Sequence, residues 1–210
     1  MARRNLDRYY TSEAAIVALL EAYPDLIRGD RLGDPSAGDG RMARMLLHAS
    51  RFGAAYLNDI DPSTLAATHL DLVDAIRQTQ VDWWVSNMPF FAMGDGAKAC
   101  LESGATGIAL LGRCTFLEPC GPSHACRRKR PVIPCSPDRC LRNGRRWITE
   151  TPPTRILSIP RISFTGDGQS DSAPAWWFVW LRGADGAWQR GTIEVMERPT
   201  GQLSLGVGDG

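Results

Sequence analysis

The sequence predicts an α/β domain in which a mostly parallel sheet carries helices on both faces. Strand-like and helix-like segments alternate along most of the chain, which is the order that builds parallel sheets. Several strand-like runs are apolar almost throughout, as expected for strands that are covered on both sides. With 210 residues, 43% of them hydrophobic and 22% charged, the chain fits a single globular domain over residues 1–210.

The first half of the chain reads in βαβα order after an initial helix. That helix is expected over residues 13–23, where Thr11 or Ser12 can cap it and Pro24 ends it. Apolar periodicity then predicts a strand near 31–33, a helix over 40–50, a strand over 54–60 and a helix over 63–77.

The second half contains buried strands on either side of an irregular insertion. Periodicity and apolar runs predict a strand over 81–85, a helix over 96–102, and strands over 106–111, 155–159 and 175–181. Residues from about 118 to 152 are rich in proline, cysteine and arginine and give no regular pattern. We interpret them as a loop-rich insertion, and residues 203–210 as a flexible tail.

Net charge makes no case for a nucleic-acid partner, because 24 lysines and arginines face 23 aspartates and glutamates. The insertion is different, since residues 127–146 hold eight basic side chains against Asp138 alone. A polyanion contact is therefore expected there, at Arg127, Arg128, Lys129, Arg130, Arg145 and Arg146. No segment resembles a signal peptide or a membrane span, so we expect a cytoplasmic protein in a bacterial host cell, with no membrane partner.

An acidic, glycine-containing turn follows the first predicted strand: Asp34-Pro35-Ser36-Ala37-Gly38-Asp39-Gly40. Its glycines let backbone approach a ligand closely, but a third glycine at dinucleotide spacing is lacking and the acids would repel a pyrophosphate. An acidic turn suits a cationic ligand better, and S-adenosylmethionine carries a sulfonium and an amino group. The alternative is a plain strand-to-helix turn.

A second acidic segment, Asn58-Asp59-Ile60-Asp61-Pro62, lies about twenty residues later at the end of the next predicted strand. An acid at that place can accept hydrogen bonds from both hydroxyls of a ribose, and Asp59 is the candidate. The alternative is that Asp59 and Asp61 only cap the following helix. The joint spacing of the two segments favours a ligand site.

The candidate catalytic segment is Asn87-Met88-Pro89-Phe90, which follows the buried strand and Ser86 directly. Open α/β folds bind their ligands at the carboxyl ends of their strands, where Asn87 is expected to project. A simple strand-ending turn is the alternative.

Together these segments resemble the small phage and prophage DNA adenine methyltransferases of the Asn-Pro-Pro-Tyr/Phe family. Tyr9-Tyr10-Thr11-Ser12 is similar to the family's Tyr-x-Thr-Pro segment, and the two acidic segments and the tetrapeptide follow in the family's order. Residues 151–168 and 176–180 are similar to its C-terminal half. The resemblance implies a Rossmann-like class I methyltransferase fold with a seven-stranded, mostly parallel sheet. It also implies that S-adenosylmethionine contacts Tyr10, Thr11 and Ile60 beside the two acidic segments.

The resemblance further implies a mechanism on double-stranded phage or bacterial DNA. The Asn87 side-chain oxygen and the Met88 carbonyl would accept hydrogen bonds from the adenine amino group, while Phe90 stacks on the flipped base. The basic residues of the insertion would contact the DNA backbone. Two residues depart from the family pattern: Met88 replaces a proline that restrains the backbone, and Ser12 replaces another.

Two other functions stay open at this stage. A methyltransferase acting on protein glutamine or on RNA would use the same tetrapeptide, and Met88 also fits a catalytically degenerate DNA-binding or accessory protein. A metal is not expected, because Cys120, His124, Cys126, Cys135 and Cys140 lack the paired spacing of structural zinc sites. The insertion is equally consistent with a disordered basic loop, and the oligomeric state is not predicted.

Overall fold

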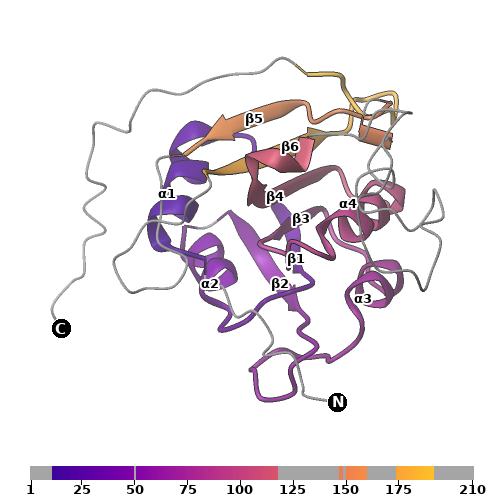
Figure 1. The fold of residues 1–210 in the computed structure, drawn as a ribbon. Helices are drawn as coiled ribbons and strands as arrows, with labels where there is room; N and C mark the ends of the chain where they lie inside the picture. The colour runs from indigo at the N-terminus through magenta and orange to yellow at the C-terminus, as the bar shows by residue number, and fades with distance from the viewer. Residues whose placement is uncertain (1–10, 50, 118–146, 149, 160–173, 192–210) are drawn as a thin grey trace, which may run out of the picture.

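A six-stranded sheet organises the part of the chain that the computed structural model describes, which is residues 11–49, 51–117, 147–148, 150–159 and 174–191 (Figure 1). The helices are α1 (Glu13–Ala22), α2 (Arg41–His48), α3 (Leu72–Gln78), α4 (Met93–Glu102) and the short 3₁₀ helix η1 (Cys114–Leu117). The strands are β1 (Gly29–Asp34), β2 (Phe52–Leu57), β3 (Trp83–Ser86), β4 (Gly107–Arg113), β5 (Arg155–Ser158) and β6 (Ala175–Leu181).

The strand order across the sheet is β2-β1-β3-β4-β6-β5. Strands β2, β1, β3 and β4 pair in parallel, and β6 runs antiparallel to both of its neighbours, β4 and β5. The expectation of a mostly parallel sheet is confirmed. The described residues hold six strands, where the family resemblance implied seven.

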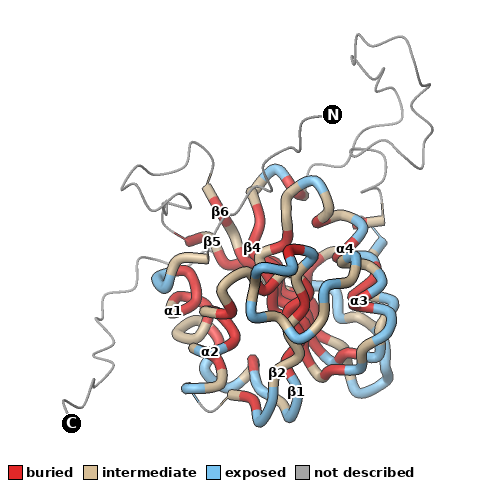
Figure 2. Tube along the Cα trace, turned by 90° about the horizontal axis from the view of Figure 1, so that it is seen from below, coloured by how far each residue is buried: buried red, intermediate tan, exposed pale blue. Residues whose placement is uncertain are grey.

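Two hydrophobic cores lie on opposite faces of the sheet. Successive side chains of β6 point alternately into one core and the other. Trp177 and Val179 face the core that also contains buried residues of α1 and α2. Phe178 and Trp180 face the other core, beneath α3 and α4. Figure 2 shows the buried strands inside and the exposed sides of the helices outside. The expectation of helices on both faces is confirmed.

The tryptophans of the strands serve packing, as their buried positions show. Trp83, Trp84, Trp177 and Trp180 are each at most 4% exposed. The Trp177 indole N–H donates to the carbonyl of Ala15 at 2.8 Å, a bond between the first helix and the last strand, 162 residues apart in sequence. Buried indoles need such a partner, because an unsatisfied N–H in the core destabilises the fold.

One predicted helix is much shorter than expected. The sequence pattern predicted a helix over 63–77, but α3 begins only after Asp71, whose carboxylate accepts the N–H of Val73 at 3.0 Å. The preceding segment consists of turns and bends, and the Asn58 side chain holds its end by bonding both the N–H and the carbonyl of Leu70. An isolated β-bridge between Asn58 and Thr68 completes this arrangement. Tertiary hydrogen bonds have overridden local propensity here.

Most of the insertion and the whole tail over 203–210 lie outside the described residues. At the end of the insertion, Ile148 is buried and the Trp147 ring meets the Phe116 ring edge-on, with centroids 6.5 Å apart. The Trp147 ring therefore packs on the domain. No helix in the described ranges is long and apolar enough to cross a membrane.

Candidate active site

The first strand-to-helix turn, residues 34–40, is shaped by two glycines with positive φ. Gly38 has φ 55° and Gly40 has φ 71°, a region that side chains with a Cβ rarely adopt. The Gly40 N–H donates to the carbonyl of Ala37 at 2.8 Å, which closes the turn, and α2 begins at the next residue. The sequence predicted this turn and its place correctly.

Asp59 joins this turn to the end of β2. One of its carboxylate oxygens accepts the N–H of Gly38 at 2.8 Å, and the other accepts the N–H of Asp61 at 2.9 Å. The structure thus brings together the two acidic segments that the sequence analysis paired by spacing. Asp59 is half-buried, so its carboxylate fixes the turn and remains partly accessible to a ligand.

Asn58 is a site residue that the sequence analysis did not assign a role. It is fully buried, and its amide nitrogen donates to the carbonyls of Pro35 at 3.0 Å and Leu70 at 3.1 Å. Its side-chain oxygen accepts from the Thr68 hydroxyl at 2.8 Å and from the N–H of Leu70 at 2.9 Å. A polar residue at the end of an otherwise apolar strand was the available signal. Asn58 ties the turn over 34–40 to the loop before α3.

A buried carboxyl group connects the first turn with the tetrapeptide. Asp34 is 1% exposed, and one of its oxygens accepts the Ser86 hydroxyl at 2.7 Å and the N–H of Ser36 at 3.2 Å. Burial raises the pKa of Asp34 to about 7, against the lowering effect of the Ser86 hydrogen bond. Near neutral pH the side chain is therefore poised between its neutral and charged forms.

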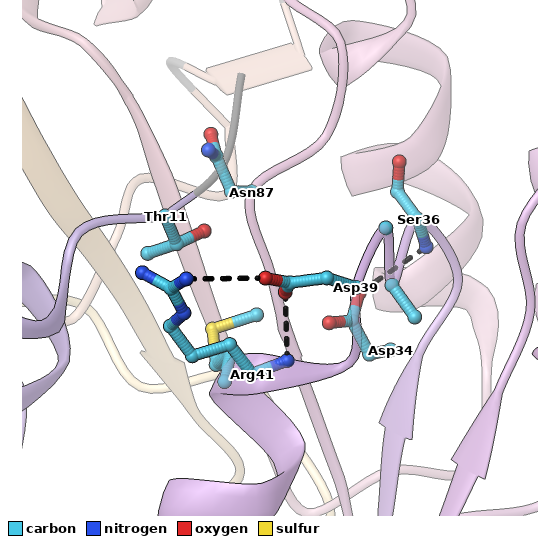
Figure 3. A pocket seen from close by; sticks show the side chains of 9 residues that line it. Thr11, Asp34, Ser36, Asp39, Arg41 and Asn87 are labelled. Carbon is cyan, nitrogen blue, oxygen red and sulfur yellow. Dashed lines mark hydrogen bonds and ion pairs between the residues drawn. The ribbon is translucent and has the colours of Figure 1, made fainter. Parts of the chain in front are cut away.

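A small pocket opens between these segments and Asn87 (Figure 3). It is lined by Thr11, Asp34, Ser36, Ala37, Gly38, Asp39, Arg41, Met42 and Asn87. Arg41 forms an ion pair with Asp39 at 3.4 Å, so the charge of Asp39 is already balanced within the protein. Figure 3 shows the side chains of Thr11 and Asn87 at the same pocket as the first turn. Segments far apart in the sequence thus form one site.

Met88 and Pro89 hold the tetrapeptide to the domain in different ways. Met88 is 1% exposed, and its side chain packs over Gly96 of α4, where a Cβ would collide with the Met88 sulfur. The Pro89 carbonyl accepts the N–H groups of Ala92 at 2.8 Å and Met93 at 2.9 Å and so starts α4. Among the described residues none donates to the Met88 carbonyl, which suits an acceptor for a substrate amine.

Phe90 lies against Arg113, a pairing that the sequence analysis did not predict. The Arg113 guanidinium carbon is 4.6 Å from the centroid of the Phe90 ring, within the range of a cation–π contact. Arg113 ends β4, the strand next to β3. Its position at a neighbouring strand end was the signal that sequence reasoning missed.

Of the remaining predicted site residues, one lies in the part of the chain that the structure describes and the others lie outside it. Ile60 is 58% exposed beside Asp59, an unusual exposure for a large aliphatic side chain and one that suits an apolar ligand surface. Tyr10 lies outside the described residues, as do Arg127, Arg128, Lys129, Arg130, Arg145 and Arg146. The cysteines and the histidine weighed for zinc lie in the same undescribed segment.

Comparison with solved structures identifies the fold. A candidate RNA methyltransferase from Pyrococcus horikoshii matches with TM-score 0.52 and 14% identity, covering 89% of this chain and 89% of that one. A candidate hemolysin from Lactococcus lactis matches with TM-score 0.51 and 12% identity, covering 90% of this chain and 94% of that one. A dimethyladenosine transferase from Plasmodium falciparum reaches 0.49 at 8% identity, and its alignment covers 81% of this chain but only 61% of that one.

The likenesses to the Pyrococcus horikoshii and Lactococcus lactis proteins, together with the strand order, show a Rossmann-like fold of the class I methyltransferase type. No family model matches the sequence, and no curated protein is significantly similar to it.

The pocket fits the methyl donor that this fold implies, S-adenosylmethionine. Asp34 at the pocket and Asp59 beside it form no ion pair with another described residue, and their charged forms would complement a ligand with positive charge. Gly38 of the turn is half-buried, with no side chain to cover its backbone, and Ile60 offers an exposed apolar surface. Three kinds of ligand group, cationic, hydroxyl and apolar, thus find matching side chains.

Proposed function

We propose that the chain is a methyltransferase that uses S-adenosylmethionine to methylate the exocyclic amino group of adenine in DNA, with the base flipped into the site at Asn87–Phe90. The observation that carries the proposal is the position of Asn87, which lines the same pocket as Asp34 and the glycine turn. An amide at the wall of a cofactor pocket is where an acceptor for the substrate amine has to lie.

The cofactor would be held by Thr11, by the turn from Asp34 to Gly40, and by Asp59 with Ile60. Asp34 in its charged form would complement the cation, and Asp59 would accept hydrogen bonds from ribose hydroxyls through oxygens that also fix the turn. When bound, S-adenosylmethionine supplies an electrophilic methyl group. Tyr10 and the basic residues of the insertion belong to the proposal through the family resemblance.

Asn87 and Met88 would orient the amine. The Asn87 side-chain oxygen and the Met88 carbonyl accept its two hydrogens, which turns the nitrogen lone pair out of conjugation with the purine and towards the methyl group. Phe90 is half-buried and offers an aromatic surface for the flipped base. After transfer, the nitrogen loses one proton to solvent, so no side-chain base is required.

Methylation of RNA is the second candidate, because the Pyrococcus horikoshii protein with this fold is described as a candidate RNA methyltransferase. The chemistry would be the same, since an adenine or another base in a single strand presents the same amino group without the need for flipping out of a duplex. A protein glutamine would place its side-chain amide against the same two acceptors.

A methyl-transfer assay separates these substrates. Purified protein is incubated with tritiated S-adenosylmethionine and unmethylated plasmid, transfer RNA or cell protein, and the label in each is counted. We expect label on plasmid, and a fall in kcat of about 10²- to 10³-fold for Asn87→Ala, since one preorganised polar contact is removed from the transition state. Leu65→Ala, at a position 88% exposed and outside the pocket, is the matched control.

The outcomes are distinct for each hypothesis. Label on RNA alone would support the second candidate and overturn the DNA proposal. Label on plasmid that persists unchanged in Asn87→Ala, while both variants melt at the wild-type temperature, would show that Asn87 is not the acceptor. Wild-type protein that labels none of the three substrates would support a degenerate protein.

A further inference from the structure

The carboxyl ends of β3 and β4 bring an aromatic ring and a guanidinium together beside the pocket. The two strands are parallel neighbours, with Ser86 paired to Leu110. Phe90 follows β3 and Arg113 ends β4, so each side chain leaves the same edge of the sheet. The guanidinium carbon lies 4.6 Å from the ring centroid, and both residues are half-buried.

This contact restricts how Phe90 can be used. A guanidinium over one face of a benzene ring is attracted by the negative potential of that face, more strongly where water is partly excluded. One face of the Phe90 ring is therefore covered by the guanidinium. The contact also limits rotation of the ring, which reduces the entropy that stacking would otherwise cost.

We infer that Arg113 is a positioning residue, which holds the Phe90 ring in the orientation that a nucleic-acid base stacks on. The inference rests on the proposed function and sharpens it. A base has a large flat face, whereas the side-chain amide of a glutamine does not, so an oriented ring favours a base as substrate. Arg113 acts through Phe90 and makes no step of the chemistry itself.

Oligonucleotide binding tests the inference without any turnover. The probe is a fluorescein-labelled, adenine-rich single strand, measured by fluorescence anisotropy in the presence of S-adenosylhomocysteine. We expect Arg113→Met to raise Kd by roughly tenfold, as loss of a cation–π contact and of ring order implies. Arg113→Lys, which keeps a cation over the ring, should recover part of this loss.

A double-mutant cycle and a salt titration identify the route by which Arg113 acts. In a Phe90→Leu background, Arg113→Met should have little further effect, because the ring that it positions is already gone. The slope of log Kd against log salt should stay the same in Arg113→Met. An arginine that instead contacts a phosphate would reduce that slope by about one.

Arg155→Met is the matched control. Arg155 forms a similar cation–π contact with Tyr23, 5.4 Å from guanidinium carbon to ring centroid, but it lies on the edge strand β5, which β6 separates from β4. This variant should bind the oligonucleotide as the wild type does. Comparable melting temperatures for the two arginine variants would exclude general loss of structure as the cause.

The binding measurements can overturn the role of Arg113 independently of the methylation assay, which tests the proposed function. Equal Kd in wild type and Arg113→Met, independent effects of Arg113 and Phe90, or a changed salt slope would each overturn the inference. Coupled binding effects in a protein that transfers no methyl group would support the positioning role and overturn the proposed function alone. Wild-type protein that binds no oligonucleotide would overturn the inference as well.

Discussion

The two turns that form the site are built on different physical principles. The turn over 34–40 is fixed by hydrogen bonds to its backbone, from Asp59, Asn58 and its own residues. The turn over 86–90 is fixed mainly by its side chains, with Met88 in a hydrophobic core and Phe90 against Arg113. The first therefore depends on backbone conformation, and the second on side-chain volume and contact.

This difference explains the residue that departs most from the family pattern. A proline at position 88 would restrain the backbone through its ring, whereas Met88 anchors the same stretch by packing over Gly96 and near Leu72. A long, unbranched side chain fills an irregular gap well. The tetrapeptide can thus keep its position without the family proline, provided that the core around Met88 stays intact.

The largest expected effect comes from emptying that core. Met88→Ala should lower the free energy of unfolding by about 2–5 kcal/mol, the usual range for removing a buried methionine side chain. Met88→Leu keeps most of the volume and should cost less than about 1.5 kcal/mol. Urea unfolding of both variants measures this, with Met45→Ala as the control because Met45 is only half-buried.

Equal losses for Met88→Ala and Met45→Ala would contradict the contrast between the turns. Met88→Pro introduces the proline of the family that the sequence resembles, but it removes the same buried side chain. We therefore expect it to be less stable than Met88→Leu, whatever its methyl-transfer rate.

The next effect concerns the buried carboxyl of the first turn. Since the folded-state pKa of Asp34 is about 7 and its ordinary value is 3.8, the folded protein binds the proton more tightly than the unfolded chain does. Stability from this group is thus fully present below about pH 4 and is lost as the pH rises to about 7. This difference in the pKa of Asp34 corresponds to a contribution of up to about 4 kcal/mol to the free energy of unfolding.

Asp34→Asn mimics the neutral form at every pH. We expect it to be more stable than the wild type at pH 8, with a difference that shrinks as the pH falls towards 4. It should also bind S-adenosylmethionine more weakly, because the charged partner is gone. Urea unfolding across this pH range tests the first point, calorimetric titration tests the second, and the exposed Asp25→Asn serves as control. A stability difference that does not vary with pH would contradict the assignment.

The smallest effect should come from Gly40, which directly precedes α2. Gly40→Ala places a Cβ at φ 71°, which destabilises by about 1–2 kcal/mol. Gly104→Ala is the matched control, since a Cβ there meets nothing within 4 Å and the backbone is not in the positive φ region. Thermal unfolding that ranks the two variants equally would show that the first turn does not depend on its backbone conformation.

The sequence predicted the strands well because their apolar runs record burial on both faces. Each predicted strand overlaps an observed one, and the acidic turn and Asp59 meet as their spacing indicated. The helix over 63–77 was wrong because Asn58 bonds Leu70, a contact that periodicity does not register. The Phe90 and Arg113 contact was missed for a similar reason, since it depends on which strands are neighbours.

The bond between Trp177 and Ala15 also bears on how the molecule assembles. The first helix packs on a core that includes the last strand, so α1 cannot reach its final environment until residue 177 has left the ribosome. Pairing β4 with β6 likewise joins segments that are distant in sequence. Such high contact order is associated with slow folding, and nascent chains that stop before β6 expose an apolar sheet edge to chaperones and proteases. The packing of α1 is therefore completed only after β6 has been synthesised.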